Sequence, residues 1–118
     1  MTWNGSIVFF GTDDLEQTDR FYRELLGLEL YKDQGACRIY EVPGGGMLGF
    51  CKHIEVINDT KSPILTLLAD DVDGIHKRLV KDGVEIEKEP EENPKFNIYH
   101  FFGYDPSGYT VEIQKFLD

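Results

Sequence analysis

Two side chains in the C-terminal part of the sequence could together move a proton. Glu112 lies in an alternating segment, residues 109–116, and His100 lies in the preceding strand-like segment, residues 97–104. A carboxylate and an imidazole in one pocket can act as general base and general acid. We therefore predict that Glu112 and His100 are the candidate catalytic residues.

Each of these residues also has a purely structural interpretation. Glu112 could be a remnant that pairs with Arg38 or with a tyrosine, and His100 could be satisfied by the backbone or by a neighbouring side chain. The remaining histidines, His53 and His76, are expected on the surface. The sequence leaves these alternatives open.

A second group of residues could bind a flat or apolar molecule. Arg38 and Tyr40 alternate on one face of a strand-like segment, and an arginine directed into a cavity can bind a carboxylate or phosphate. Aromatic rings supply stacking surfaces. The candidate ligand-binding residues are Phe9, Arg38, Tyr40, Phe50, Phe102 and Tyr104. Core packing of the rings and a solvent-facing arginine are the alternatives.

The elements that must position these residues occur twice. The stretch IVFFGTDDL from Ile7 is echoed by ILTLLADDV from Ile64, and in each copy an apolar run ends in two aspartates before a helical pattern begins. Two copies of one supersecondary unit are indicated, each with a strand, a helix and three more strands. The expected strands are residues 6–12, 28–31, 37–42, 47–52, 64–69, 84–87, 97–104 and 109–116.

Helical spacing also predicts which residues of the two helices face inward. The expected inward residues are Leu15, Thr18, Phe21, Tyr22, Leu25 and Leu26 in the first helix, and Val72, Ile75, Leu79 and Val80 in the second. The acidic segment 88–94 is expected to be a solvated loop.

Composition excludes several kinds of partner. The net charge of −10 over 118 residues repels nucleic acid and acidic lipid surfaces, and no apolar run is long enough to span a membrane. Cys37 and Cys51 show no spacing typical of zinc or redox motifs, so we expect two reduced thiols in a cytoplasmic protein. The chain is expected to form one domain, residues 1–118.

The helix sequence DLEQTDRFY with its ending LLGL, and the closing sequence DPSGYTVEI, resemble the vicinal oxygen chelate superfamily. This superfamily includes glyoxalase I, extradiol dioxygenases, fosfomycin-modifying enzymes and bleomycin-resistance proteins. The resemblance implies an α+β fold in which two βαβββ repeats, about residues 6–54 and 63–117, form a cupped mixed sheet with helices on the convex face. In the first strand it places Ile7, Phe9 and Gly11 toward a ligand cavity.

The resemblance also implies positions for a divalent metal ion on the first and fourth strands of each repeat. These positions are occupied by Ile7, Gly49, Ile64 and Glu112, of which only Glu112 has a donor side chain. A divalent ion needs three or four protein donors. We therefore expect no metal ligands and no cofactor, with a divalent metal bound at a misaligned site as the alternative.

These observations favour a metal-independent protein that binds a small organic molecule in an aromatic-lined cleft, and we expect a homodimer. The alternative is a lyase, isomerase or dioxygenase of the same superfamily, either metal-dependent or using Glu112 and His100 as base and acid. A vestigial domain that acts through protein contacts is a third interpretation. The sequence leaves open whether the protein is an enzyme.

Overall fold

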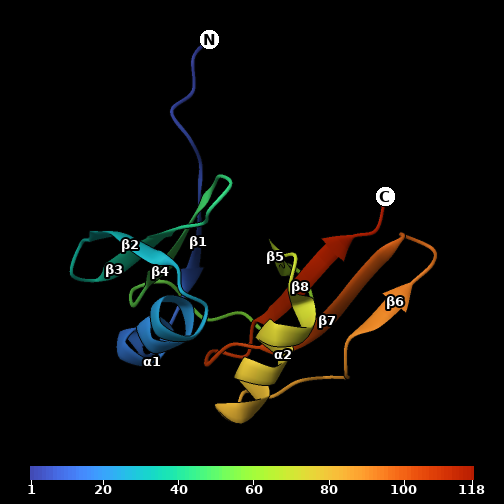
Figure 1. Ribbon diagram of the computed structural model, residues 1–118. Helices are drawn as coiled ribbons and strands as arrows, with labels where there is room; N and C mark the ends of the chain where they lie inside the picture. Colours follow the sequence, from blue (N-terminus) through green and yellow to red (C-terminus); the bar gives the residue numbers. More distant parts are fainter. The chain divides into compact units, whose positions relative to one another are not determined.

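The computed structural model describes residues 1–118 as two compact units, Met1–Ile57 and Asn58–Asp118 (Figure 1). The first unit contains β1 (Ile7–Gly11), α1 (Leu15–Asp19), the π-helical turn η1 (Arg20–Leu25), β2 (Glu29–Asp33), β3 (Cys37–Glu41) and β4 (Met47–Cys51). The second unit contains β5 (Leu65–Leu68), α2 (Val72–Lys81), β6 (Glu91–Asn93), β7 (Ile98–Tyr104) and β8 (Thr110–Phe116).

Both units have the same sheet topology. The strand order is β1-β4-β3-β2 in the first unit and β5-β8-β7-β6 in the second. In each, the first and last strands of the unit pair in parallel and the other neighbours are antiparallel. The predicted α+β fold with two βαβββ modules is confirmed.

Each helix begins where an aspartate follows the first strand. Asp14 accepts hydrogen bonds from the backbone amides of Glu16 and Gln17 at 3.1 Å, and Asp71 accepts one from that of Gly74 at 2.9 Å. These carboxylates satisfy amides that have no partner in the first helical turn. The repeated Asp-Asp pair is thus a repeated helix start.

The core of the first unit is an aromatic stack between helix and sheet. Tyr22, Tyr40 and Phe50 have no exposed surface, and the Phe50 ring lies 4.5 Å from that of Tyr22 and 5.6 Å from that of Phe10, centroid to centroid. Phe10 and Thr12 are buried, and the Thr12 hydroxyl lies 2.8 Å from that of Thr18 on α1. Val8, on the same face of β1 by alternation, is 53% exposed.

The core of the second unit lies between α2 and the strands β7 and β8. Val72 and Leu79 are buried on the helix, and Phe101 packs edge-on against His76 with ring centroids 5.1 Å apart. His76 is therefore half-buried rather than a free surface residue. The expectation that Val80 faces inward is wrong: it is 51% exposed, because it lies about 100° around the helix from Leu79.

The strand expected at residues 84–87 and the loop expected at 88–94 both differ from the structure. Residues 84–87 make one isolated bridge, from Ile86 to Gly103, whereas Glu91–Asn93 forms β6 at the edge of the sheet. Edge strands are commonly short and carry charged side chains, which discourage pairing with another chain. The charged sequence therefore concealed a short strand.

The expectation of two reduced thiols is also wrong, because Cys37 and Cys51 form a disulfide. They are directly opposite in the antiparallel pairing of β3 and β4, which brings their Cα atoms to 4.1 Å. The register of a hairpin follows from its turn, and the two cysteines lie four residues before Glu41 and four residues after Met47, which flank the turn, so this symmetry was the available signal. No helix is long and apolar enough to cross a membrane.

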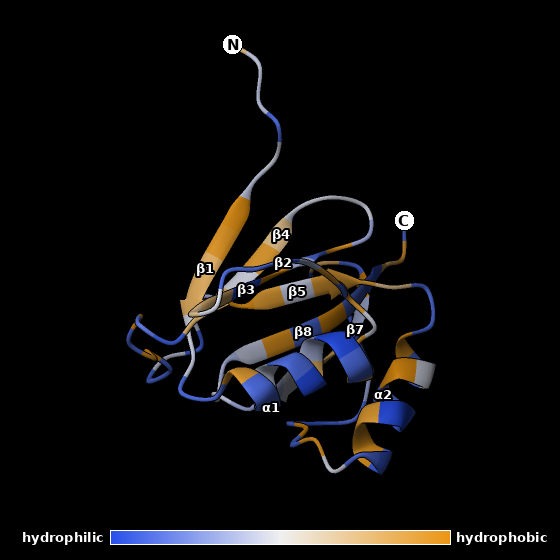
Figure 2. Ribbon diagram, turned by 90° about the vertical axis from the view of Figure 1, so that its left-hand side faces the viewer, coloured by the Kyte–Doolittle hydropathy of each residue, from blue (hydrophilic) through white to orange (hydrophobic).

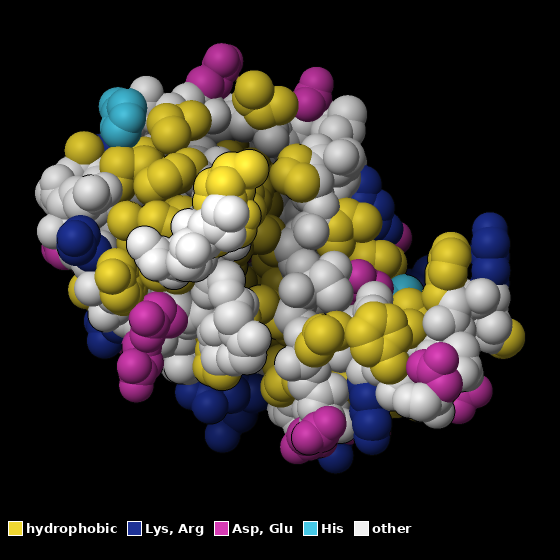
Figure 3. All heavy atoms as spheres, turned by 90° about the horizontal axis from the view of Figure 1, so that it is seen from above, with side chains coloured by type: hydrophobic (Ala, Val, Ile, Leu, Met, Phe, Trp, Pro, Cys, Tyr) yellow, Lys and Arg dark blue, Asp and Glu magenta, His cyan; other side chains and the backbone are white.

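Surface hydropathy differs between the elements. Figure 2 shows β1 as apolar along its length, whereas the helices carry both hydrophilic and hydrophobic residues. Ile7, Val8 and Phe9 on β1 are 37%, 53% and 46% exposed. Hydrophobic side chains accordingly form part of the molecular surface in Figure 3.

Candidate functional site

A carboxylate in the second sheet holds the imidazole of a histidine. The Nδ1 atom of His100 lies 2.7 Å from Oε2 of Glu112, and the hydroxyl of Thr66 donates to Oε1 of Glu112 at 2.7 Å. The three residues belong to β7, β8 and β5, and the register pairs Thr66 with Glu112 across the parallel strands. Neighbouring strands therefore align the group.

Both titratable side chains of this group, Glu112 and His100, are buried. The exposed fraction is 6% for Glu112 and 9% for His100. Burying a carboxylate is costly unless its oxygens are hydrogen-bonded, and here each oxygen has a partner. Nδ1 of His100 faces the carboxylate, so the tautomer with its proton on Nδ1 donates to Glu112 and leaves Nε2 to interact with a bound molecule.

His100 lines a cavity of about 250 Å³ within the second unit. The lining residues are Lys61, Glu87, Lys88, Glu89, Glu91, Asn93, His100, Phe101 and Phe102. The Lys61 ammonium lies 3.7 Å from the centroid of the Phe102 ring and 3.1 Å from a carboxylate oxygen of Glu87. Glu112 is not part of this lining, so its influence on the cavity runs through His100.

The predicted neighbourhood of Glu112 and His100 is confirmed. The alternation of β7 places His100, Phe102 and Tyr104 on one face, while Phe101 faces α2, and the register sets Phe102 beside Glu112. The alternative pairing of Glu112 with Arg38 or a tyrosine is wrong, because its partners are His100 and Thr66.

Three candidate ligand-binding residues of the first unit lie on the helix side of their sheet. Phe50 belongs to the aromatic core, the Tyr40 hydroxyl donates to Asp19 at 2.8 Å, and Arg38 donates to Glu16 at 2.8 Å. The placement expected for Arg38, Tyr40 and Phe50 is therefore corrected. The alternation of residues correctly predicted that Arg38 and Tyr40 lie on one face of the sheet. Alternation alone does not say which face of the sheet the helix covers.

The contacts of Asp19 show that this part of the first unit is structural. Arg23 donates to the Asp19 carboxylate at 2.7 Å, and this hydrogen bond lowers the pKa of Asp19. Burial, followed by the hydrogen bond to Asp19, raises the pKa of the Tyr40 hydroxyl well above its usual range. The ionised Asp19 on α1 therefore stabilises the packing of this helix against β3, through its hydrogen bond to Tyr40.

Phe9 lies on the opposite face of the first sheet, as expected. A Cβ atom added at Gly49 would come within 2.5 Å of the Phe9 ring, so the ring covers the backbone of Gly49. Phe9 is 46% exposed. Its role in ligand binding stays a prediction.

The residues at the family's metal positions do not fit a divalent ion. In the first unit, Ile7 and Gly49 offer no donor, and the Phe9 ring occupies the space that a side chain at position 49 would need. In the second unit, Ile64 offers no donor and both oxygens of Glu112 are already hydrogen-bonded. We derive no chemical step through a metal at these positions.

Sequence reasoning missed Thr66 and every residue that lines the cavity except His100 and Phe102. Thr66 is the polar residue in the apolar sequence LTLL of β5, and its polarity was the available signal. Lys61 lies in the connection before β5, where nothing in the sequence indicates that it will reach the Phe102 ring.

The chain is an α+β protein built from two copies of one βαβββ module, and the candidate site lies on the last strands of the second module. A sequence profile of the Glyoxalase/Bleomycin resistance protein/Dioxygenase superfamily matches residues 6–113, and the chain belongs to this superfamily. No curated protein sequence matches the chain.

Solved structures share the fold. A glyoxalase/bleomycin resistance protein/dioxygenase family enzyme from Burkholderia phytofirmans PsJN is 19% identical, with a TM-score of 0.80 over 92% of this chain and 95% of that chain. A glyoxalase/dioxygenase from Nostoc punctiforme is 17% identical, with a TM-score of 0.79 over 95% of this chain and 90% of that chain. At these identities the likeness shows the fold alone.

Proposed function

We propose that the protein binds a small organic molecule in the cavity beside His100 and does so without a metal cofactor. The observation that carries this proposal is the buried Glu112–His100 pair, which presents an imidazole to a cavity of about 250 Å³. Ligand pockets typically combine apolar walls with a few fixed polar groups. Here Phe101 and Phe102 supply the apolar surface, and the other lining residues are His100, Asn93, two lysines and three glutamates.

The dimensions and chemistry of the cavity define the kind of ligand. Its volume is below the roughly 300 to 1,000 Å³ of sites for drug-sized molecules, which favours a small metabolite. When His100 is neutral, its free Nε2 accepts a hydrogen bond, so the ligand carries a hydroxyl, an N–H group or an acidic proton. Membership of the Glyoxalase/Bleomycin resistance protein/Dioxygenase superfamily supports a small organic ligand.

A second candidate function is metal-independent acid-base catalysis, as in an isomerase or lyase. The same pair favours it, because Nε2 of His100 can take a proton while Glu112 stabilises the imidazolium that forms. A substrate with an acidic C–H group beside a carbonyl would meet this requirement. A compound that binds without being converted would support the ligand-binding function. A compound whose conversion requires His100 would support acid-base catalysis.

The test is a thermal-shift screen of the whole chain with small hydroxy acids, keto acids and amides, repeated with His100→Gln. We expect a compound that raises the melting temperature of the unsubstituted protein and has little effect on His100→Gln. His53→Gln, a change at an exposed histidine of the first unit, is the matched control and should respond like the unsubstituted protein. Equal shifts in His100→Gln and the unsubstituted protein would contradict the proposal.

Metal independence is tested by measuring the affinity of such a compound before and after treatment with a chelator, with the cysteines oxidised. We expect no change, because the positions inherited from the family supply a single donor side chain, Glu112. Loss of binding after chelation, restored by one divalent ion per chain, would show that ligand binding depends on a metal ion and would contradict the proposal.

We further propose that the protein is a homodimer. β1 is at the edge of the sheet of the first unit, and its residues Ile7, Val8 and Phe9 are apolar and exposed. Such edges are usually covered.

The cytoplasmic location stays a prediction, and in a reducing compartment Cys37 and Cys51 would be held as thiols.

A further inference from the structure

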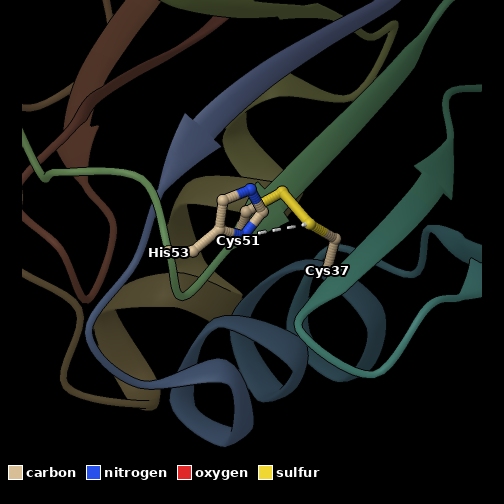
Figure 4. Close-up of side chains that lie close together, drawn as sticks. All are labelled: Cys37, Cys51 and His53. Carbon is tan, nitrogen blue, oxygen red and sulfur yellow. Dashed lines mark hydrogen bonds between the residues drawn. A yellow bond between two sulfur atoms is a disulfide. The ribbon is translucent and has the colours of Figure 1, made fainter.

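A cluster of soft donor atoms lies at one end of the β3–β4 hairpin in the first unit. Cys37 is the first residue of β3, Cys51 is the last residue of β4, and His53 follows two residues later (Figure 4). Their ligand atoms all lie within 4.8 Å of one another. Nothing in the proposed function of His100 and Glu112 uses this cluster.

The histidine approaches one of the two sulfur atoms directly. Nδ1 of His53 lies 3.9 Å from Sγ of Cys37. Zinc binds thiolate sulfur at about 2.3 Å and imidazole nitrogen at about 2.0 Å, which puts the two donors of one tetrahedral ion about 3.5 Å apart. The separation in the disulfide form is therefore already close to that required by a shared ion.

We propose that reduction of the Cys37–Cys51 disulfide creates a zinc site whose ligands are the two thiolates and Nδ1 of His53. A dithiol reductant supplies two electrons and two protons: the Cys37–Cys51 bond breaks, two thiols form, and the reductant closes its own disulfide. Zinc then displaces the two thiol protons and binds both sulfur atoms.

The donor set identifies the class of metal. Two thiolates and an imidazole select soft or borderline ions such as Zn²⁺, whereas Mg²⁺ and Ca²⁺ require oxygen donors. Three protein ligands leave a fourth tetrahedral position for water or a small anion. The hydrogen-bonded ladder of β3 and β4 fixes both cysteine backbones in advance, so little ordering accompanies metal binding.

Burial indicates how an ion would enter. Cys51 is 1% exposed and Cys37 is 7% exposed, whereas His53 is exposed. The imidazole therefore forms the solvent-accessible side of the cluster, and the sulfur atoms form its buried side. In the oxidised state the sulfur atoms are bonded to each other and neither can act as a thiolate ligand.

The test compares the oxidised whole chain with the chain treated with a phosphine reductant, which competes less for metal than a dithiol. Both are titrated with Co²⁺, whose thiolate charge-transfer absorption reports sulfur ligation, and Zn²⁺ is then added to displace it. We expect one equivalent per chain in the reduced protein and no charge-transfer absorption in the oxidised protein.

Substitutions separate the proposed ligands from the rest of the chain. His53→Ala should weaken Zn²⁺ binding about tenfold or more and leave the fold intact, because this side chain is exposed. His76→Ala, at a histidine on α2, is the matched control and should leave the affinity unchanged. Cys51→Ser should abolish the charge-transfer absorption.

Three outcomes would overturn the proposal. These are equal binding by the oxidised and reduced chains, an affinity that His53→Ala leaves unchanged, and loss of the folded circular dichroism signal on reduction. None of them bears on ligand binding at His100, so this proposal and the proposed function can fail separately.

Discussion

Glu112 connects two neighbouring strands through its side chain, because one oxygen accepts from Thr66 on β5 and the other is bound by His100 on β7. A carboxylate in this position does two things at once. It satisfies buried polar groups, and it selects the tautomer of His100 that leaves Nε2 free. The stability of this group and the proposed role of His100 therefore depend on the same side chain.

Replacing Glu112 by Gln should preserve the shape of the side chain but remove the charge from the bond to His100. Charge-assisted hydrogen bonds are stronger than neutral ones, so the free energy of unfolding should fall by about 1 to 3 kcal/mol. Urea unfolding measures this change. Glu92→Gln, at an exposed position of β6, is the control and should stay within about 0.5 kcal/mol of the unsubstituted protein. Equal midpoints for both variants would contradict the role of Glu112.

Asp19 should make stability depend on pH in the acid range. The hydrogen bond from Arg23 holds the pKa of Asp19 below its ordinary value of 3.8, so the unfolded chain binds the proton first as pH falls. The contribution of Asp19 is therefore complete above about pH 4 and is lost as pH falls through the lowered pKa.

The measurement is urea unfolding of the unsubstituted protein and of Asp19→Asn at about pH 7 and about pH 3. We expect the difference in unfolding free energy between them to be large at the higher pH and smaller at the lower pH. Glu29→Gln on the exposed β2 is the control, with a small difference at both values. A difference for Asp19→Asn that does not change with pH would show that the carboxylate is not stabilised by ionisation.

At the scale of elements, α2 provides a direct comparison of two adjacent residues. Leu79 is 2% exposed and Val80 is 51% exposed. Leu79→Ala should lower the free energy of unfolding by about 2 to 5 kcal/mol, because it leaves a cavity against the sheet. Val80→Ala should change it by less than about 0.5 kcal/mol. Similar effects at both positions in chemical denaturation would contradict the helix orientation.

At the scale of the whole molecule, the exposed apolar edge β1 determines our expectation of the oligomeric state. Sedimentation at micromolar concentration should give about twice the chain mass of 13.6 kDa. Val8→Lys should yield the monomer, because a charge on this edge would be buried without a partner. Tyr31→Lys, at an equally exposed position on the other edge strand, should remain dimeric. A monomeric unsubstituted protein would exclude the dimer.

The sequence by itself determined the repeat, the class of fold and the face shared by His100, Phe102 and Tyr104. These features depend on local periodicity and on helix-starting aspartates, which are properties of short segments. The same periodicity could not say that Arg38, Tyr40 and Phe50 face the helix, since alternation defines two faces without saying which one is covered.

Only the tertiary structure decided the partners of Glu112 and of the two cysteines. The disulfide of Cys37 with Cys51, the contact of His53 with that pair and the hydroxyl of Thr66 on Glu112 all join residues on different strands or segments. The turn of the β3–β4 hairpin sets the cysteine pairing locally, but β5 and β8 are parallel strands far apart in the sequence, so no turn sets the register that brings Thr66 to Glu112.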